Sequence, residues 1–201
     1  MPPWNPIVIA FHLVWTAYGT WLPNDPRGSG SQKVVSPDLA ELGELHHGRK
    51  SVQPPFHEVR NFYERAEPLL KFDVMRFDRA QIESIAAAFS AIVAERRYTC
   101  YACAILPDHT HIVVRKHRDR AESMIARLQE ASRLRLSSEG LSPPNHPVWT
   151  SGGWKSFLDS PAAVRAAVRY VEKNPLKSGL GAQSWPFVQP YDGWSFGKRN
   201  P

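Results

Sequence analysis

Two histidines separated by one residue are the side chains best placed for chemistry. His109 and His111 lie in the run Pro107-Asp108-His109-Thr110-His111-Ile112-Val113-Val114. In a β-strand, side chains at positions i and i+2 point to the same face, roughly 7 Å apart, so two imidazoles at this spacing can converge on one divalent metal ion. The alternative is a half-polar sheet face on which both histidines make ordinary hydrogen bonds. This segment alone leaves both interpretations open.

A helix later in the chain carries a second pair of reactive side chains. The sequence predicts that it begins at Ser160-Pro161 and ends at Asn174-Pro175. At about 100° per residue, Tyr170 lies roughly 110° from the centre of the apolar stripe, and Asn174 follows on the same side. The alternative is a boundary tyrosine with a packed ring and a hydrated hydroxyl, which periodicity alone favours. The apolar stripe itself consists of Val164, Ala167, Val168 and Val171.

The rest of the chain predicts a scaffold of strands and helices. The capping pair Asp78 and Gln81 predicts the start of a helix, and two adjacent β-forming runs predict an antiparallel hairpin. The order of elements suits an α+β fold with a ferredoxin-like antiparallel sheet and helices on one face. The expected strands cover residues 7–17, 98–105, 109–114 and 148–158, and a further helix covers residues 120–136.

One domain accounts for most of the length. We expect a single domain over residues 1–182, interrupted by a long insertion at about 18–77 after the first strand, and an aromatic, Pro-rich tail over 183–201. The insertion should hold one or two short helices. Its adjacent histidines, His46 and His47, are interpreted as a solvated pair.

Composition favours a polyanionic partner, and the cytoplasm is the expected location. The chain has 201 residues, a net charge of +6 and a pI near 9.5, and a basic balance of this kind is typical of nucleic-acid-binding proteins. No apolar run reaches the roughly 20 residues that span a bilayer. The start, Met1-Pro2-Pro3-Trp4-Asn5, lacks the features of a signal peptide. Cys100 and Cys103, three residues apart in a predicted strand, should point to opposite faces and serve as packing residues.

Taken together, the two motifs support a family resemblance. The chain resembles the single-tyrosine HUH transposases, which include insertion-sequence transposases acting on single-stranded DNA and the REP-associated tyrosine transposases. The residues that carry the resemblance are the histidine motif and the run from Arg169 to Leu180 (Arg-Tyr-Val-Glu-Lys-Asn-Pro-Leu-Lys-Ser-Gly-Leu). The likeness extends over residues 7–17 and about 78–180.

The resemblance implies a reaction and the roles of four residues. His109 and His111 would bind a catalytic Mg²⁺ or Mn²⁺, and Tyr170 would attack a single-stranded DNA phosphodiester to give a 5′-phosphotyrosine. The position four residues after the tyrosine supplies a further metal ligand in the family, often Gln; here it is Asn174. Thr110 also departs from the family, where a large hydrophobic residue stands between the histidines.

The expected partner is single-stranded DNA with hairpin or palindromic ends, and the resemblance also allows a homodimer. Trp154 and Phe157 are candidates for stacking on bases. One alternative is a catalytically inactive nucleic-acid-binding protein of the same fold, and another is a metal-dependent hydrolase, which would need more carboxylates near the histidines. Cationic side chains expected to bind DNA are Arg127, Arg133, Lys155, Arg165, Arg169, Lys173 and Lys177.

Overall fold

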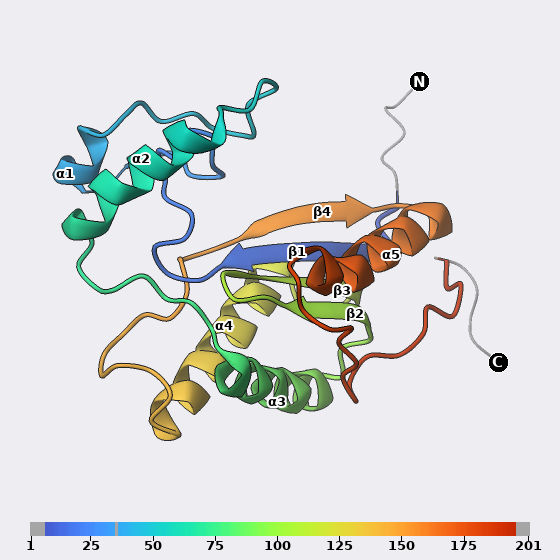
Figure 1. Ribbon diagram of the computed structural model, residues 1–201. Coiled ribbons are helices and arrows are strands. Elements are labelled where there is room, and N and C mark those ends of the chain that lie inside the picture. The colour runs from blue at the N-terminus through green and yellow to red at the C-terminus, as the bar shows by residue number, and fades with distance from the viewer. Residues whose placement is uncertain (1–6, 35, 196–201) are drawn as a thin grey trace.

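A four-stranded antiparallel sheet forms the centre of the molecule (Figure 1). The computed structural model describes residues 7–34 and 36–195, so the first residues of the chain and the end of the predicted tail lie outside the described part. The strands are β1 (Ala10–Thr16), β2 (Cys100–Ile105), β3 (His109–Arg115) and β4 (Trp154–Leu158), in the spatial order β2-β3-β1-β4. This order, with a helix between β1 and β2 and another between β3 and β4, is ferredoxin-like. The predicted α+β class and the predicted hairpin are confirmed.

Two long helices cover one face of this sheet. They are α3 (Arg79–Arg96) and α4 (Ala121–Ser138), each of 18 residues. The predicted capping box starts α3: the Gln81 backbone N–H donates to Asp78 Oδ1 at 2.9 Å, and the Asp78 backbone N–H donates to Gln81 Oε1 at 2.8 Å. Among the described residues, no helix is long and apolar enough to cross a membrane. The core under these helices includes Leu13, Trp15, Ile85, Phe89, Ile112 and Leu128.

The last helix, α5 (Pro161–Lys177), packs on the opposite face (Figure 1). The prediction that the helices lie on one face is therefore corrected for α5. Its predicted stripe is buried at Val164, Ala167 and Val171, and it meets Ala102, Ala104 and Val113 on β2 and β3. A second apolar layer therefore lies between α5 and the sheet. Because β2 and β3 are buried on both faces, their sequences are nearly continuous apolar runs rather than alternating ones.

The helix α5 also runs further than predicted. Pro175 lies inside it rather than ending it, since proline removes only one backbone donor near the last turn. The helix ends where Gly179 adopts a φ of 73°. There the Leu180 N–H donates to the Pro175 carbonyl at 2.9 Å and the Gly179 N–H donates to the Leu176 carbonyl at 3.2 Å. This pair of bonds is the Schellman arrangement, which glycine favours.

The insertion after β1 forms a small layer of its own. It holds α1 (Pro37–Ala40), α2 (Phe56–Ala66) and the short helix η1 (Glu67–Leu69), in agreement with the expectation of short helices. Its apolar centre is made by Leu22, Leu39, Phe62 and Ala66. The buried Asp25 carboxylate is compensated by an ion pair with Arg27 at 2.6 Å and by the Tyr63 hydroxyl. His46 and His47 are exposed, as predicted.

Two predicted strand features differ in the structure. The strand expected over residues 148–158, interrupted by glycines, is limited to β4, because Gly152, two residues before its first residue, adopts a φ of 79°. A β-bulge between Cys100 and Ala102 shifts the register of β2 against β3. The bulge places Cys100 and Cys103 in the same apolar cluster rather than on opposite faces. Both thiols are buried packing residues, as expected.

The described part of the tail lies along the free edge of β2. The Gln189 N–H donates to the Cys100 carbonyl at 2.9 Å, and the Gln183 amide pairs with both backbone groups of Ile105, at 2.9 and 2.7 Å. The Tyr191 ring packs edge-on against Tyr101. The tail therefore satisfies backbone groups that an edge strand would otherwise leave unpaired.

Thr110, between the two histidines, gives a test of the packing on the α3–α4 face. The residue is fully buried, and its hydroxyl has no hydrogen-bond partner in the described part of the chain. Because a buried unpaired hydroxyl is destabilising, Thr110→Val should raise the free energy of unfolding by about 1–2 kcal/mol, measured by urea denaturation. The control is Thr20→Val, since the Thr20 hydroxyl donates to the carbonyls of Ala17 and Asp108. That variant should be destabilised, and equal effects of the two substitutions would contradict the prediction.

Candidate active site

The histidine pair lies on the sheet face that α5 covers. In the register of β1 with β3, His109 is opposite Thr16 and His111 is opposite Val14. The two imidazole rings lie 4.8 Å apart between centroids at 80° to each other. His111 is buried and His109 is half-buried. The predicted orientation, with both imidazoles on one face and Thr110 on the other, is thus present in the structure.

Tyr170 meets this pair from α5. Its ring lies 5.5 Å from the His111 ring between centroids, in an edge-to-face arrangement at 82°. The side chain remains 46% exposed, so a large substrate can reach it from solvent. Two motifs that are distant in the sequence therefore come into contact within one chain, because α5 packs across β2 and β3.

A third histidine, His12 of β1, joins the group. Its Nε2 lies 3.0 Å from His111 Nδ1, and its ring stacks on the His111 ring with centroids 5.2 Å apart. It also contacts Tyr170 edge-on, with centroids 5.9 Å apart. His12 belongs to neither of the two sequence motifs. The feature that could have indicated it is an ionisable residue within an otherwise apolar central strand. The pairing of β1 with β3 shows why this residue matters, because it brings His12 next to the strand of the histidine motif.

The partners of the imidazoles leave the same ring atom available on both motif histidines. His109 Nδ1 lies 2.6 Å from Asp108 Oδ1, and His111 Nδ1 faces His12. In metal sites, a ligating histidine typically donates its other N–H to a carboxylate or a similar acceptor. The arrangement thus fits two imidazoles that would bind a metal through Nε2.

Burial keeps His111 neutral. Loss of solvation is the main cause that lowers the pKa of His111 to about 3, followed by the nearby His109 and His12. Burial likewise lowers the pKa of His12. The hydrogen bond with His109 holds the pKa of Asp108 below its usual range. Because a metal binds the neutral form of imidazole, the environment of His111 favours the ligating form at ordinary pH.

Asn174 is the third of the predicted metal ligands. It lies one turn after Tyr170 and is buried, and its Nδ2 has no hydrogen-bond partner within the described residues. Nδ2 is a hydrogen-bond donor, so only the amide oxygen, Oδ1, could bind a cation. No group of three His, Cys, Asp or Glu side chains in the described ranges could hold a metal by itself. By chemical type, two imidazoles and an amide oxygen are donors compatible with Mn²⁺ or Mg²⁺ when phosphate oxygens and water supply the remaining positions.

The predicted cationic residues separate into two groups. Arg165, Arg169, Lys173 and Lys177 are exposed on α5, the helix that carries Tyr170. Nζ of Lys177 lies 5.2 Å from the centre of the Tyr170 ring.

The other three cations belong to α4 and β4 and are paired with carboxylates. Arg127 lies 3.7 Å from Asp119, and Arg133 lies 2.7 Å from Glu130. Lys155 pairs with Glu122 on the α3–α4 side of the sheet. The structure therefore gathers four of the predicted cations on the helix of the candidate nucleophile and places three elsewhere.

The two candidate stacking residues face opposite sides of β4. Trp154 is opposite Val14, which in turn is opposite His111, so the three side chains form one row across the α5 face of the sheet. Trp154 is 51% exposed. Phe157 points to the other face, where its ring packs edge-on against Phe11. Only Trp154 is thus aligned with the histidines.

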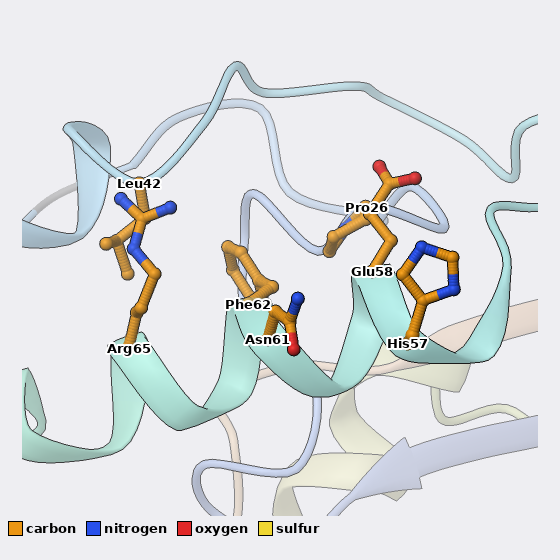
Figure 2. Close-up of a pocket in the computed structure, with 7 residues that line it drawn as sticks. All are labelled: Pro26, Leu42, His57, Glu58, Asn61, Phe62 and Arg65. Carbon is orange, nitrogen blue, oxygen red and sulfur yellow. The ribbon is translucent and has the colours of Figure 1, made fainter.

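A separate cavity lies in the insertion, away from the histidines (Figure 2). Its volume is about 360 Å³, and α2 supplies most of its wall. Figure 2 shows Arg65 near Leu42 at one end and His57 beside Glu58 at the other. None of the predicted site residues lines it. The lining residues are Pro26, Leu42, His57, Glu58, Asn61, Phe62 and Arg65.

Comparisons with known proteins give structural likenesses alone. No protein-family model matches the chain, and no curated protein matches it. Among solved structures, the chain is similar to a REP-associated tyrosine transposase bound to a REP hairpin, with 13% identity and a TM-score of 0.47 over 98% of this chain and 96% of the other. It is also similar to a protein from Deinococcus radiodurans provisionally described as a transposase, with 11% identity and a TM-score of 0.40 over 90% of this chain and 98% of the other.

The low pKa of His111 predicts a pH dependence of stability. In the folded metal-free protein His111 stays neutral down to about pH 3, whereas in the unfolded chain it protonates near pH 6.5. The unfolded state therefore binds more protons between these values, so stability should rise with pH in this window, by up to about 1.4 kcal/mol per pH unit from this group. Urea denaturation with a chelator present, from pH 4 to pH 7, measures the slope. His111→Asn should reduce it, and an unchanged slope would show that His111 does not titrate as described.

Proposed function

We propose that this chain is a single-tyrosine HUH transposase that nicks single-stranded DNA and transfers the strand. The observation that supports it most strongly is the contact between Tyr170 and His111, with ring centroids 5.5 Å apart. This contact unites an accessible nucleophile with a pair of potential metal ligands. The surroundings suit a long substrate, because the Tyr170 side chain is 46% exposed to solvent.

Tyr170 acts as the nucleophile of the proposed reaction. Its phenolic oxygen attacks the phosphorus of a DNA phosphodiester, a new O–P bond forms, and the bond from phosphorus to the 3′ oxygen breaks. The phenol loses a proton and the departing 3′ oxygen gains one, so the step is balanced without consuming water. The products are a 5′-phosphotyrosine and a free 3′-hydroxyl, and the covalent bond keeps the strand available for rejoining.

His109, His111 and Asn174 are the proposed ligands of a divalent ion. The imidazoles would bind through Nε2, since Nδ1 of each faces Asp108 or His12, and Asn174 would add an amide oxygen from α5. When bound, Mg²⁺ or Mn²⁺ supplies Lewis-acid stabilisation of charge on the phosphate. Asp108 would orient the His109 imidazole, and the burial of His111 limits competition from protons.

The proposed DNA path follows the uncovered part of the α5 face. Lys177 lies beside the Tyr170 ring, where its ammonium group can pair with the phosphate that flanks the scissile one. Trp154 offers an exposed ring in the same row as His111. A flexible single strand of DNA could therefore pass from α5 across the histidines to β4. By the resemblance, the substrate would be a single-stranded end beside a hairpin, and a homodimer is compatible with this path.

Removal of the Tyr170 hydroxyl should abolish covalent attachment. A hairpin oligonucleotide with a labelled single-stranded flank, incubated with the purified chain and Mn²⁺, should give an adduct that survives denaturing gel electrophoresis. Tyr170→Phe keeps the ring contacts with His111 and His12 but lacks the attacking oxygen, so no adduct should form. An adduct formed by the Phe variant would overturn the assignment of the nucleophile.

The metal ligands are tested in the same experiment. His109→Ala should lose adduct formation by 100-fold or more, on the order expected for a metal ligand, while binding of the oligonucleotide falls only slightly. Equal loss of both would argue against a metal role. DNA binding by the wild-type chain that is indifferent to Mn²⁺ and gives no adduct would instead identify a catalytically inactive DNA-binding protein of this fold.

Trp154 should contribute to DNA affinity and Phe157 should not. A base stacked on an aromatic ring contributes roughly 1–3 kcal/mol, so Trp154→Ala should weaken binding of the oligonucleotide by about 5- to 150-fold in fluorescence anisotropy. Phe157→Ala is the matched control, since this side chain is also exposed on β4 but faces the other side of the sheet. Equal effects of the two variants would exclude a DNA path confined to the α5 face.

A further inference from the structure

His12 is the one ionisable side chain of β1, and its position across the sheet brings it to the histidine motif. In the register of the two strands it is opposite Val113, which places it on the α5 face beside His111. Its Nε2 lies 3.0 Å from His111 Nδ1. The flanking residues of β1, Phe11 and Leu13, point into the apolar core on the other face. An imidazole at this position is therefore held next to the proposed site by the alternation of the strand itself.

The contact between the two imidazoles can exist in two forms. At 3.0 Å one nitrogen must carry the hydrogen and the other must accept it. If His12 donates, His111 accepts at Nδ1 and carries its own hydrogen on Nε2, which blocks that atom as a ligand. If His111 donates from Nδ1, its Nε2 keeps a free lone pair. The second form alone is compatible with a metal bound through Nε2.

We propose that His12 is a positioning residue that accepts the hydrogen bond from His111 Nδ1 and thereby holds the His111 imidazole in the tautomer and orientation that bind a metal ion. This inference rests on the proposed metal role of His111. His12 would serve His111 as the Asp108 carboxylate serves His109, at 2.6 Å from His109 Nδ1. Each motif histidine would then have its own acceptor, one a carboxylate and the other a neutral imidazole.

The geometry argues against His12 as a metal ligand itself. The nitrogen that faces the site, Nε2, is already directed at His111 Nδ1. Within the described residues, His12, His109 and His111 do not form a group of three that could hold one ion. Partners that orient ligands lie in this position in metal sites, one hydrogen bond behind the ligating residue.

His12 also connects the metal ligand with the nucleophile. Its ring stacks on His111 at an angle of 27° and meets the Tyr170 ring edge-on, with centroids 5.2 and 5.9 Å away. The packing role and the hydrogen-bond role can be separated by substitution. His12→Leu fills the space without an acceptor, whereas His12→Gln places an amide oxygen near the position of Nε2.

The test measures Mn²⁺ binding and the state of the His111 ring in the full chain. Titration calorimetry with Mn²⁺ alone should give similar affinities for the wild type and His12→Gln, and an affinity about 10- to 100-fold weaker for His12→Leu. Long-range ¹H–¹⁵N NMR of the metal-free protein should place the His111 proton on Nδ1 in the wild type. In His12→Leu the Nε2–H form should gain population. The NMR measurement on the wild type needs no variant to fold.

Each outcome decides the inference. Equal Mn²⁺ affinities in the wild type and His12→Leu, or a wild-type His111 protonated on Nε2, would overturn the role of His12 and leave the proposed metal site intact. A wild-type chain that does not bind Mn²⁺ would overturn the metal role of His109 and His111, and the inference with it. A loss of affinity in His12→Leu that His12→Gln restores would support it.

Discussion

The alternation of side chains along β3 is the constraint on which the rest of the structure depends. Thr110, Ile112 and Val114 pack under α3 and α4, while His109 and His111 point to the side of α5. A shift of the pairing by one residue would exchange the two sets, burying the imidazoles under α3 and α4 and moving Ile112 and Val114 to the α5 face. Because the strand lies inside the sheet with both faces covered, its register is fixed by burial on each side. The candidate site is a direct result of that register.

The candidate site lies at the border of the apolar contact between α5 and the sheet. Under α5, Val113 and the small side chains of β2 bury the helix stripe, and His111 lies at the border of this layer. Burial there disfavours the charged imidazole. Asp108 and His12 compensate by providing hydrogen-bond partners for the two motif histidines. Tyr170, by contrast, remains half-exposed, so the same short segment of structure combines a desolvated ligand with an accessible nucleophile.

The two edge strands of the sheet, β2 and β4, differ in what covers them. The tail covers the edge of β2 with backbone bonds and the Gln183 amide, whereas β4, at the other edge, carries the exposed Trp154. The insertion approaches this second edge, since a Cβ added at Gly30 would lie 3.4 Å from the Trp154 ring. The long insertion, which has its own small core, thus lies beside Trp154.

The sequence by itself determined the elements and most of the reacting residues. The capping box at Asp78, the hairpin and the α5 stripe follow from local patterns, since each depends on neighbours within a few residues. It could not predict that α5 lies opposite the other helices, that the helix passes through Pro175, or that a bulge turns Cys100 toward the side of Cys103. It also could not connect His12 with His111, because strand pairing is a contact between distant segments. Tertiary structure decided these features, since burial of two sheet faces at once selects among arrangements that local patterns leave equal.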